Sequence, residues 1–182
     1  MEQITNRDIT NRAATNGLIL GAVSGGYVFI NFALAGSVAG TLLSWVLWLG
    51  KLIGCILLMR WFMKKLVSEF SGVTNSDTRR LGNLTALFSA ILTAVCYYVA
   101  VDFVFPDIIA ETQDALMEQM SGMLDDNTRA AMENISGKMG SIQFFFQLIW
   151  CCLYGVVLSA ILSARIPTPD PFANFNENTD EQ

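Results

Sequence analysis

The sequence predicts an all-α, polytopic membrane protein with four transmembrane helices and an amphipathic helical hairpin outside the membrane. Of its 182 residues, 53% are hydrophobic and 15% are charged, whereas a soluble domain has about 25% charged residues. The charges are also unevenly distributed, because residues 13–50, 81–101 and 139–164 contain none. A helix needs about 20 mostly apolar residues to cross a bilayer core. The charge-free windows are therefore the expected spans.

The first window is too long for one helix, and small residues interrupt it at positions 35–40, Ala-Gly-Ser-Val-Ala-Gly. We interpret this break as a tight hairpin between a first span at residues 14–35 and a second at 41–62. A cleaved signal peptide is disfavoured, because the apolar stretch exceeds the usual length of about 7–15 residues. The third and fourth spans are expected at residues 81–105 and 140–164.

The second span includes a lysine, Lys51, near its middle. A central lysine costs roughly 2.5–3.5 kcal/mol on insertion scales, and each central Leu, Ile or Val returns about 0.3–0.6 kcal/mol. The many aliphatic residues around Lys51 offset this cost, so the segment is still expected to insert. Trp45 and Trp48 towards one end, and Arg60 and Lys64 at the other, are typical of residues at membrane interfaces.

The distribution of Lys and Arg predicts the orientation, because cytoplasmic loops are enriched in both. With the amino terminus in the cytoplasm, eight of the eleven are cytoplasmic, two are outside and Lys51 is in the membrane. We therefore expect a multi-pass protein of a bacterial inner membrane with both termini in the cytoplasm. The cytoplasmic set is Arg7, Arg12, Arg60, Lys64, Lys65, Arg79, Arg80 and Arg165, and the outer set is Arg129 and Lys138.

The segments outside the spans have their own patterns. Thr74 and Asp77 form a capping-box pattern ahead of the third span. The outer loop, residues 106–139, is acidic and has apolar residues at helical spacing, which predicts two amphipathic helices joined by a turn. Residues 166–182 are rich in Pro and Asn and are expected to form a disordered cytoplasmic tail. Residues 1–165 then form a single membrane domain.

Three glycines, Gly17, Gly21 and Gly25, repeat every four residues in the first span. Small residues at this spacing allow two membrane helices to approach closely. The pattern predicts helix packing, and it fits a contact within the chain as well as a contact between two copies.

Lys51 is the one charge deep within a predicted span, and an ionisable residue at that depth is a candidate functional site. Asn31, Tyr97 and Gln147 fall at comparable depths on the other helices, and Asp102 lies nearer the outer interface. One hypothesis is an outward-facing polar pocket for an anion or a lipid headgroup. The alternative is a neutralised lysine that interhelical hydrogen bonds hold in place.

Catalytic and metal-binding patterns are not found in the sequence. It has no histidine, which excludes Ser-His-Asp and Cys-His nucleophilic sites and His-liganded zinc. The four cysteines all fall within spans and match no metal-ligand spacing, so we interpret them as small apolar residues. We expect neither an enzyme, nor a cofactor, nor a nucleic-acid partner.

Three short segments stand out in the predicted membrane domain. They are Gly-Leu-Ile-Leu-Gly at residues 17–21, Arg-Leu-Gly at 80–82 and Phe-Val-Phe-Pro-Asp at 103–107. In these segments the chain resembles a family called domain of unknown function 4199, four-span membrane proteins found largely in Bacteroidetes. The resemblance covers residues 13–165, and it implies residence in a bacterial inner membrane without implying an activity.

Two functional hypotheses remain. The leading one is a structural or accessory membrane protein, which packs with a second copy of itself or with a larger membrane complex besides the lipid bilayer. The alternative is a small transporter or channel component that uses the polar pocket around Lys51. A membrane enzyme is a third and weaker hypothesis, because no catalytic set occurs at membrane depth.

Overall fold

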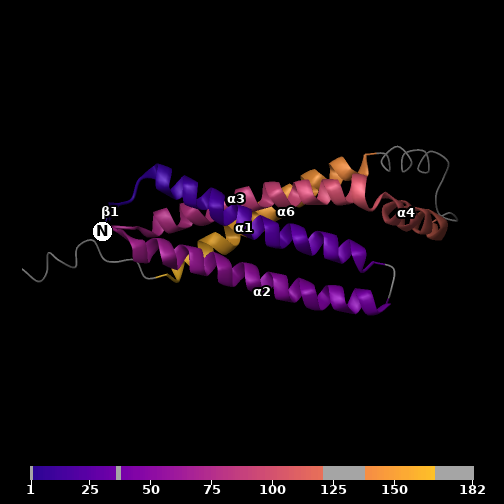
Figure 1. The fold of residues 1–182 in the computed structure, drawn as a ribbon, viewed down its shortest axis with the longest axis horizontal. Coiled ribbons are helices and arrows are strands. Elements are labelled where there is room, and N and C mark those ends of the chain that lie inside the picture. The colour runs from indigo at the N-terminus through magenta and orange to yellow at the C-terminus, as the bar shows by residue number, and fades with distance from the viewer. Residues whose placement is uncertain (1, 36–37, 121–137, 167–182) are drawn as a thin grey trace, which may run out of the picture.

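The computed structural model describes residues 2–35, 38–120 and 138–166, and it confirms the all-α class and the four spans (Figure 1). Within these ranges, four helices are long and apolar enough to cross a membrane. They belong to an antiparallel bundle in which the chain runs back and forth along the long axis. The helices are α1 (Asn6–Ala33), α2 (Val38–Glu69), α3 (Asn75–Val99), the π-helical turn η1 (Ala100–Val104), α4 (Pro106–Met120) and α6 (Met139–Ala164).

The helices extend beyond the predicted spans, and side-chain caps explain two of their starts. The predicted capping box before α3 is present, since Thr74 N–H donates to the Asp77 carboxylate at 3.0 Å. An equivalent box at Thr5 and Asp8 begins α1 well before its apolar part. The predicted hairpin between α1 and α2 occupies the short connection after Ala33, and residues 36 and 37 of it lie outside the described residues.

The centre of the bundle is α3, which packs extensively against α1 and against α6. The glycine stripe of α1 faces α3. A Cβ atom at Gly17 would lie 2.5 Å from the Phe88 Cβ, and one at Gly25 would lie 2.6 Å from the Cys96 Sγ. The stripe therefore makes a contact within the chain, in which missing side chains let two helix backbones approach each other.

Small residues also allow α3 and α6 to approach each other closely. A Cβ atom at Gly155 of α6 would overlap the Ala86 Cβ, and one at Gly82 of α3 would overlap Ser159. The Ser159 hydroxyl donates to the Arg79 carbonyl at 2.9 Å. Small residues thus bring α1, α3 and α6 together into a closely packed group of three helices.

In contrast, α2 makes sparse contacts with the other three helices. It is held mainly at the end of the bundle that contains β1 (Glu2–Gln3) and β2 (Phe70–Ser71), which we call the terminal end. There α2 contributes to two buried apolar clusters that also include residues of α1, α3 and α6. Their buried members from α2 are Cys55, Met59, Met63 and Leu66.

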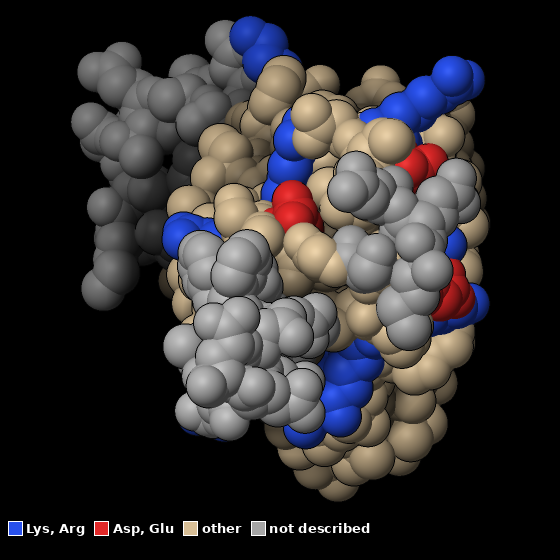
Figure 2. Space-filling model, turned by 90° about the vertical axis from the view of Figure 1, so that its left-hand side faces the viewer, with Lys and Arg blue, Asp and Glu red and all other residues tan. Residues whose placement is uncertain are grey.

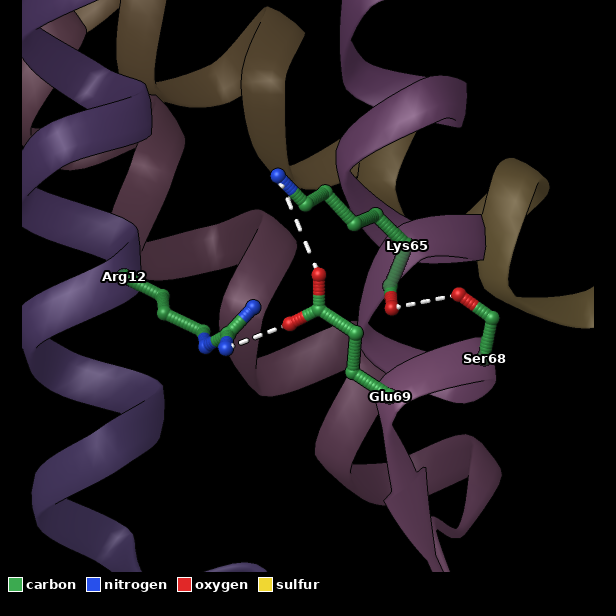
Figure 3. Close-up of polar contacts among 4 residues, drawn as sticks. All are labelled: Arg12, Lys65, Ser68 and Glu69. Carbon is green, nitrogen blue, oxygen red and sulfur yellow. Dashed lines mark hydrogen bonds and ion pairs between the residues drawn. The ribbon is translucent and has the colours of Figure 1, made fainter.

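Polar contacts also join α1 and α2 at the terminal end. The Glu69 carboxylate accepts from the Arg12 guanidinium at 2.5 Å and lies 3.8 Å from the Lys65 ammonium (Figure 3). Arg12 also lies over the Phe70 ring, with 4.8 Å to the ring centroid. Beside this group β1 and β2 pair in parallel, a two-residue ladder that the sequence did not predict. Lys and Arg surround this end of the molecule (Figure 2).

The opposite end, which we call the hairpin end, contains the α1–α2 connection, η1 and the start of α6. There α4 extends beyond the bundle (Figure 1). It lies in the part of the outer loop where the sequence predicts the first of two amphipathic helices, whereas the second predicted helix lies outside the described residues. The predicted tail lies outside them too, apart from Ile166.

Large apolar side chains cover the outer surfaces of α2 and α6. A soluble protein rarely exposes so extensive an apolar surface, whereas a membrane protein directs such side chains towards lipid. Residues between 59% and 67% exposed include Leu42, Trp45, Val46, Phe145, Phe146, Ile149, Trp150 and Leu153.

Gly17→Ala should destabilise the protein by about 1–3 kcal/mol, because the added methyl group forces α1 and α3 apart. Gly26→Ala, on the same helix, is the matched control, since a Cβ atom at Gly26 would meet nothing within 4 Å. It should leave the stability unchanged or raise it by up to about 1 kcal/mol through helix propensity. Thermal unfolding in detergent measures both, and equal stabilities of the two variants would contradict the close α1–α3 contact.

Candidate intramembrane binding cavity

A cavity of about 350 Å³ lies between α2 and the packed group of α1, α3 and α6. It occupies the region where α2 is not drawn against the other helices by small residues. All four helices contribute polar side chains to its wall, although each of them is mostly apolar. These polar residues are Ser24 and Tyr27 of α1, Lys51 of α2, Ser89, Thr93 and Tyr97 of α3, and Gln147 and Tyr154 of α6.

Among the described residues that line this cavity, Lys51 is the one that carries a charge. Its ammonium group lies over the Tyr27 ring, 4.8 Å from the ring centroid. The attraction between a cation and an aromatic face offsets part of the hydration free energy that the cation loses in the membrane. The described wall contains no Asp or Glu, so it supplies no counter-ion for Lys51.

The polar wall is partly ordered by contacts within single helices. Gln147 Nε2 donates to the Cys151 Sγ at 3.1 Å, one turn further along α6. The Thr93 hydroxyl donates to the Ser89 carbonyl at 2.8 Å. These contacts use one polar atom of each side chain and leave the carbonyl oxygen of Gln147 as a further hydrogen-bonding group in the wall.

A second hollow of about 570 Å³ lies at the hairpin end, between the end of α1 and the start of α2. Asn31, Thr41 and Ser44 are among its lining residues. Tyr27 and Trp48 line both the hollow and the inner cavity. These two aromatic side chains therefore stand between the hairpin end of the protein and Lys51.

The structure distributes the five predicted pocket residues over three places. Lys51, Tyr97 and Gln147 line the inner cavity, and Asn31 lines the hollow at the hairpin end. Asp102 lines neither. It is exposed in η1, and its carboxylate lies against Gly140. There the amino-terminal end of α6 offers positive partial charge to a carboxylate.

Sequence reasoning missed Tyr27 and Trp48. Trp48 could have been found from its spacing, because residues three positions apart on a helix share a face and Trp48 precedes Lys51 by three. Tyr27 could not have been found in this way. Its place over the lysine depends on the rotation of α1 that the glycine contacts with α3 impose.

The described residues contain no group of three or more His, Cys, Asp or Glu that could hold a metal ion. Cys55 and Cys151 line the cavity as free thiols. What the cavity offers a ligand is one positive charge, hydrogen-bonding groups and an apolar wall.

A family model described as protein of unknown function (DUF4199) matches residues 15–167. This chain belongs to that family. The match takes in every residue that lines the cavity of this DUF4199 protein, and it agrees with the resemblance found in the short sequence segments. No curated protein and no solved structure matches the chain. The family description carries no activity, so the role of the cavity has to be inferred from its chemistry.

Proposed function

We propose that this DUF4199 protein binds a small anion inside the membrane, as a transporter or as the ligand-binding component of a transport system. One observation carries the proposal: Lys51 lies in a cavity to which no described carboxylate contributes. A charge in the membrane is costly unless something compensates it. An anionic ligand would provide the missing charge, and Gln147 and Tyr97 would provide hydrogen bonds beside it.

The hollow at the hairpin end supports an entry route. It shares Tyr27 and Trp48 with the inner cavity, so rotation of either ring would join the two spaces. In the proposed orientation the hairpin end faces outward, and the ligand would enter from the extracytoplasmic side. The basic terminal end supports that orientation in a bacterial inner membrane (Figure 2).

Reporter fusions test the orientation. Green fluorescent protein fused after Gln182 should be fluorescent in cells, and alkaline phosphatase fused there should be inactive, because the phosphatase needs an extracytoplasmic environment to form its disulfides. The same phosphatase inserted between residues 121 and 137 should be active. Phosphatase activity at the carboxyl terminus would contradict the proposed orientation.

Quenching of tryptophan fluorescence tests anion binding. A protein with Trp45→Phe, Trp61→Phe and Trp150→Phe keeps Trp48 alone, which lines the cavity beside Lys51. Iodide, a small anion, should quench Trp48 more strongly than neutral acrylamide does. Adding Lys51→Leu should remove this preference while leaving the stability equal or up to about 3 kcal/mol higher, because a buried charge is lost.

A protein that keeps Trp61 alone provides the control. Trp61 lies at the terminal end, with the Lys65 ammonium 5.2 Å from its ring centroid. It therefore has a neighbouring cation but does not line the cavity, and Lys51→Leu should not alter its quenching by iodide. If Trp48 shows no preference for iodide, or keeps it after Lys51→Leu, the anion-binding proposal fails.

A structural or accessory role is the second candidate, and α4 supports it. This helix extends beyond the bundle, and among the described residues its main contacts are with η1. Its surface could therefore dock on another membrane protein. Purification in mild detergent should then recover a partner in fixed ratio, and deletion of residues 106–120 should abolish its recovery. A lone monomer in both preparations would contradict this role.

A further inference from the structure

We propose that the ligand is an amphipathic anion, with its charged group at Lys51 and one apolar chain that lies in the cavity and extends towards the terminal end. This inference rests on the proposed anion binding and adds the class and direction of the ligand.

The wall of the cavity changes character along the bundle axis. At the level of Lys51, the polar or charged atoms come from Tyr27, Tyr97 and Gln147. Towards the terminal end the lining is mostly apolar, with Leu20, Met59 and Leu158, and with Ala86 and Gly155 where α3 meets α6. The polar side chains in this part are Ser89 and Tyr154. A ligand that is charged throughout would leave this apolar part without a complementary group. A ligand with one charged end matches both parts.

The length of the apolar part fits a chain and not a compact group. Lys51 and Met59 both line the cavity and lie eight residues apart on α2, which is about 12 Å along a helix axis. Beyond Met59 the space ends, because Met63 and Leu162 are buried there in one apolar cluster and do not line the cavity. The cavity therefore has a polar level at one end and a closed apolar floor at the other.

The cavity also reaches the surface that faces lipid. Trp150 and Tyr154 of α6 line it, yet Trp150 is 63% exposed and Tyr154 is 41% exposed. The wall of α6 is thus shared between the cavity and the apolar exterior. Because α2 packs sparsely against α6, an amphiphile dissolved in the bilayer would have a short lateral path to Lys51. A fully hydrated ion could not follow this lateral path through the bilayer.

Protection of Trp48 from iodide tests the inference in nanodiscs of phosphatidylcholine. The protein that keeps Trp48 alone is titrated with decanoate, butyrate and decanol. Decanoate should protect Trp48 at concentrations at least about tenfold lower than either of the others, as expected for loss of the apolar contacts or of one charge-assisted hydrogen bond. Equal protection by butyrate or by decanol would overturn the proposal.

Two substitutions on α6 locate the chain. Leu158→Phe fills the apolar floor and should weaken protection by decanoate at least about tenfold while leaving butyrate unchanged. Leu153→Phe is the matched control, because Leu153 is 59% exposed and does not line the cavity. It should change neither ligand. If both variants keep the decanoate response of the unsubstituted protein, the chain does not occupy the floor and the proposal fails.

Nanodiscs of phosphatidylglycerol distinguish a bilayer lipid from a free acid, which share an anionic group on an apolar chain. Protection of Trp48 in these nanodiscs without added decanoate, if lost in Leu158→Phe, would identify the source as a membrane lipid and would support the proposal.

Failure of this inference differs from failure of the proposed function. If iodide retains its Lys51-dependent preference but decanoate acts no better than butyrate, the anion site stands and the amphipathic ligand does not.

Discussion

The close approach of α1 and α6 to the two sides of α3 is the constraint on which the rest of the structure depends. Glycines remove the side chains that would keep the backbones apart, at Gly17 and Gly25 on one side and at Gly155 on the other. In a bilayer the hydrophobic effect does not drive helices together, so van der Waals contact between closely packed backbones has to supply the association. This contact fixes the rotation of α1 and α6 about their own axes.

The remaining helix, α2, packs against this group in a different way. It is held at the terminal end by large buried side chains such as Met63 and Leu66, and by the Arg12–Glu69 ion pair. That ion pair is about one-third exposed on both partners, so its own contribution is about 0–1 kcal/mol. The apolar clusters therefore hold α2 in place at this end. Further towards the hairpin end, bulky side chains separate α2 from its neighbours, and the space left between them is the cavity.

The cavity accounts for the presence of a lysine, Lys51, at membrane depth. A lysine on the lipid-facing side of α2 would have to reach the interface to keep its charge hydrated. Within the cavity it has an aromatic face beneath it and polar groups from three other helices around it. In the proposed function, this arrangement holds Lys51 at membrane depth and presents its side chain to an anion. Tyr27 lies between Lys51 and the hollow at the hairpin end, so its ring separates the two spaces.

The sequence by itself determined the four spans, the capping box before α3 and the presence of a helix-packing stripe, because length, charge and local spacing decide these features. It also singled out Lys51. Only the tertiary structure decided that the stripe faces α3, that Asn31 lies in a separate hollow, that Asp102 is directed to α6, and that Tyr27 covers the lysine. These features depend on how far each helix is rotated and tilted against its neighbours. Depth along a helix can be counted from the sequence, whereas rotation follows from contacts between residues far apart in the chain.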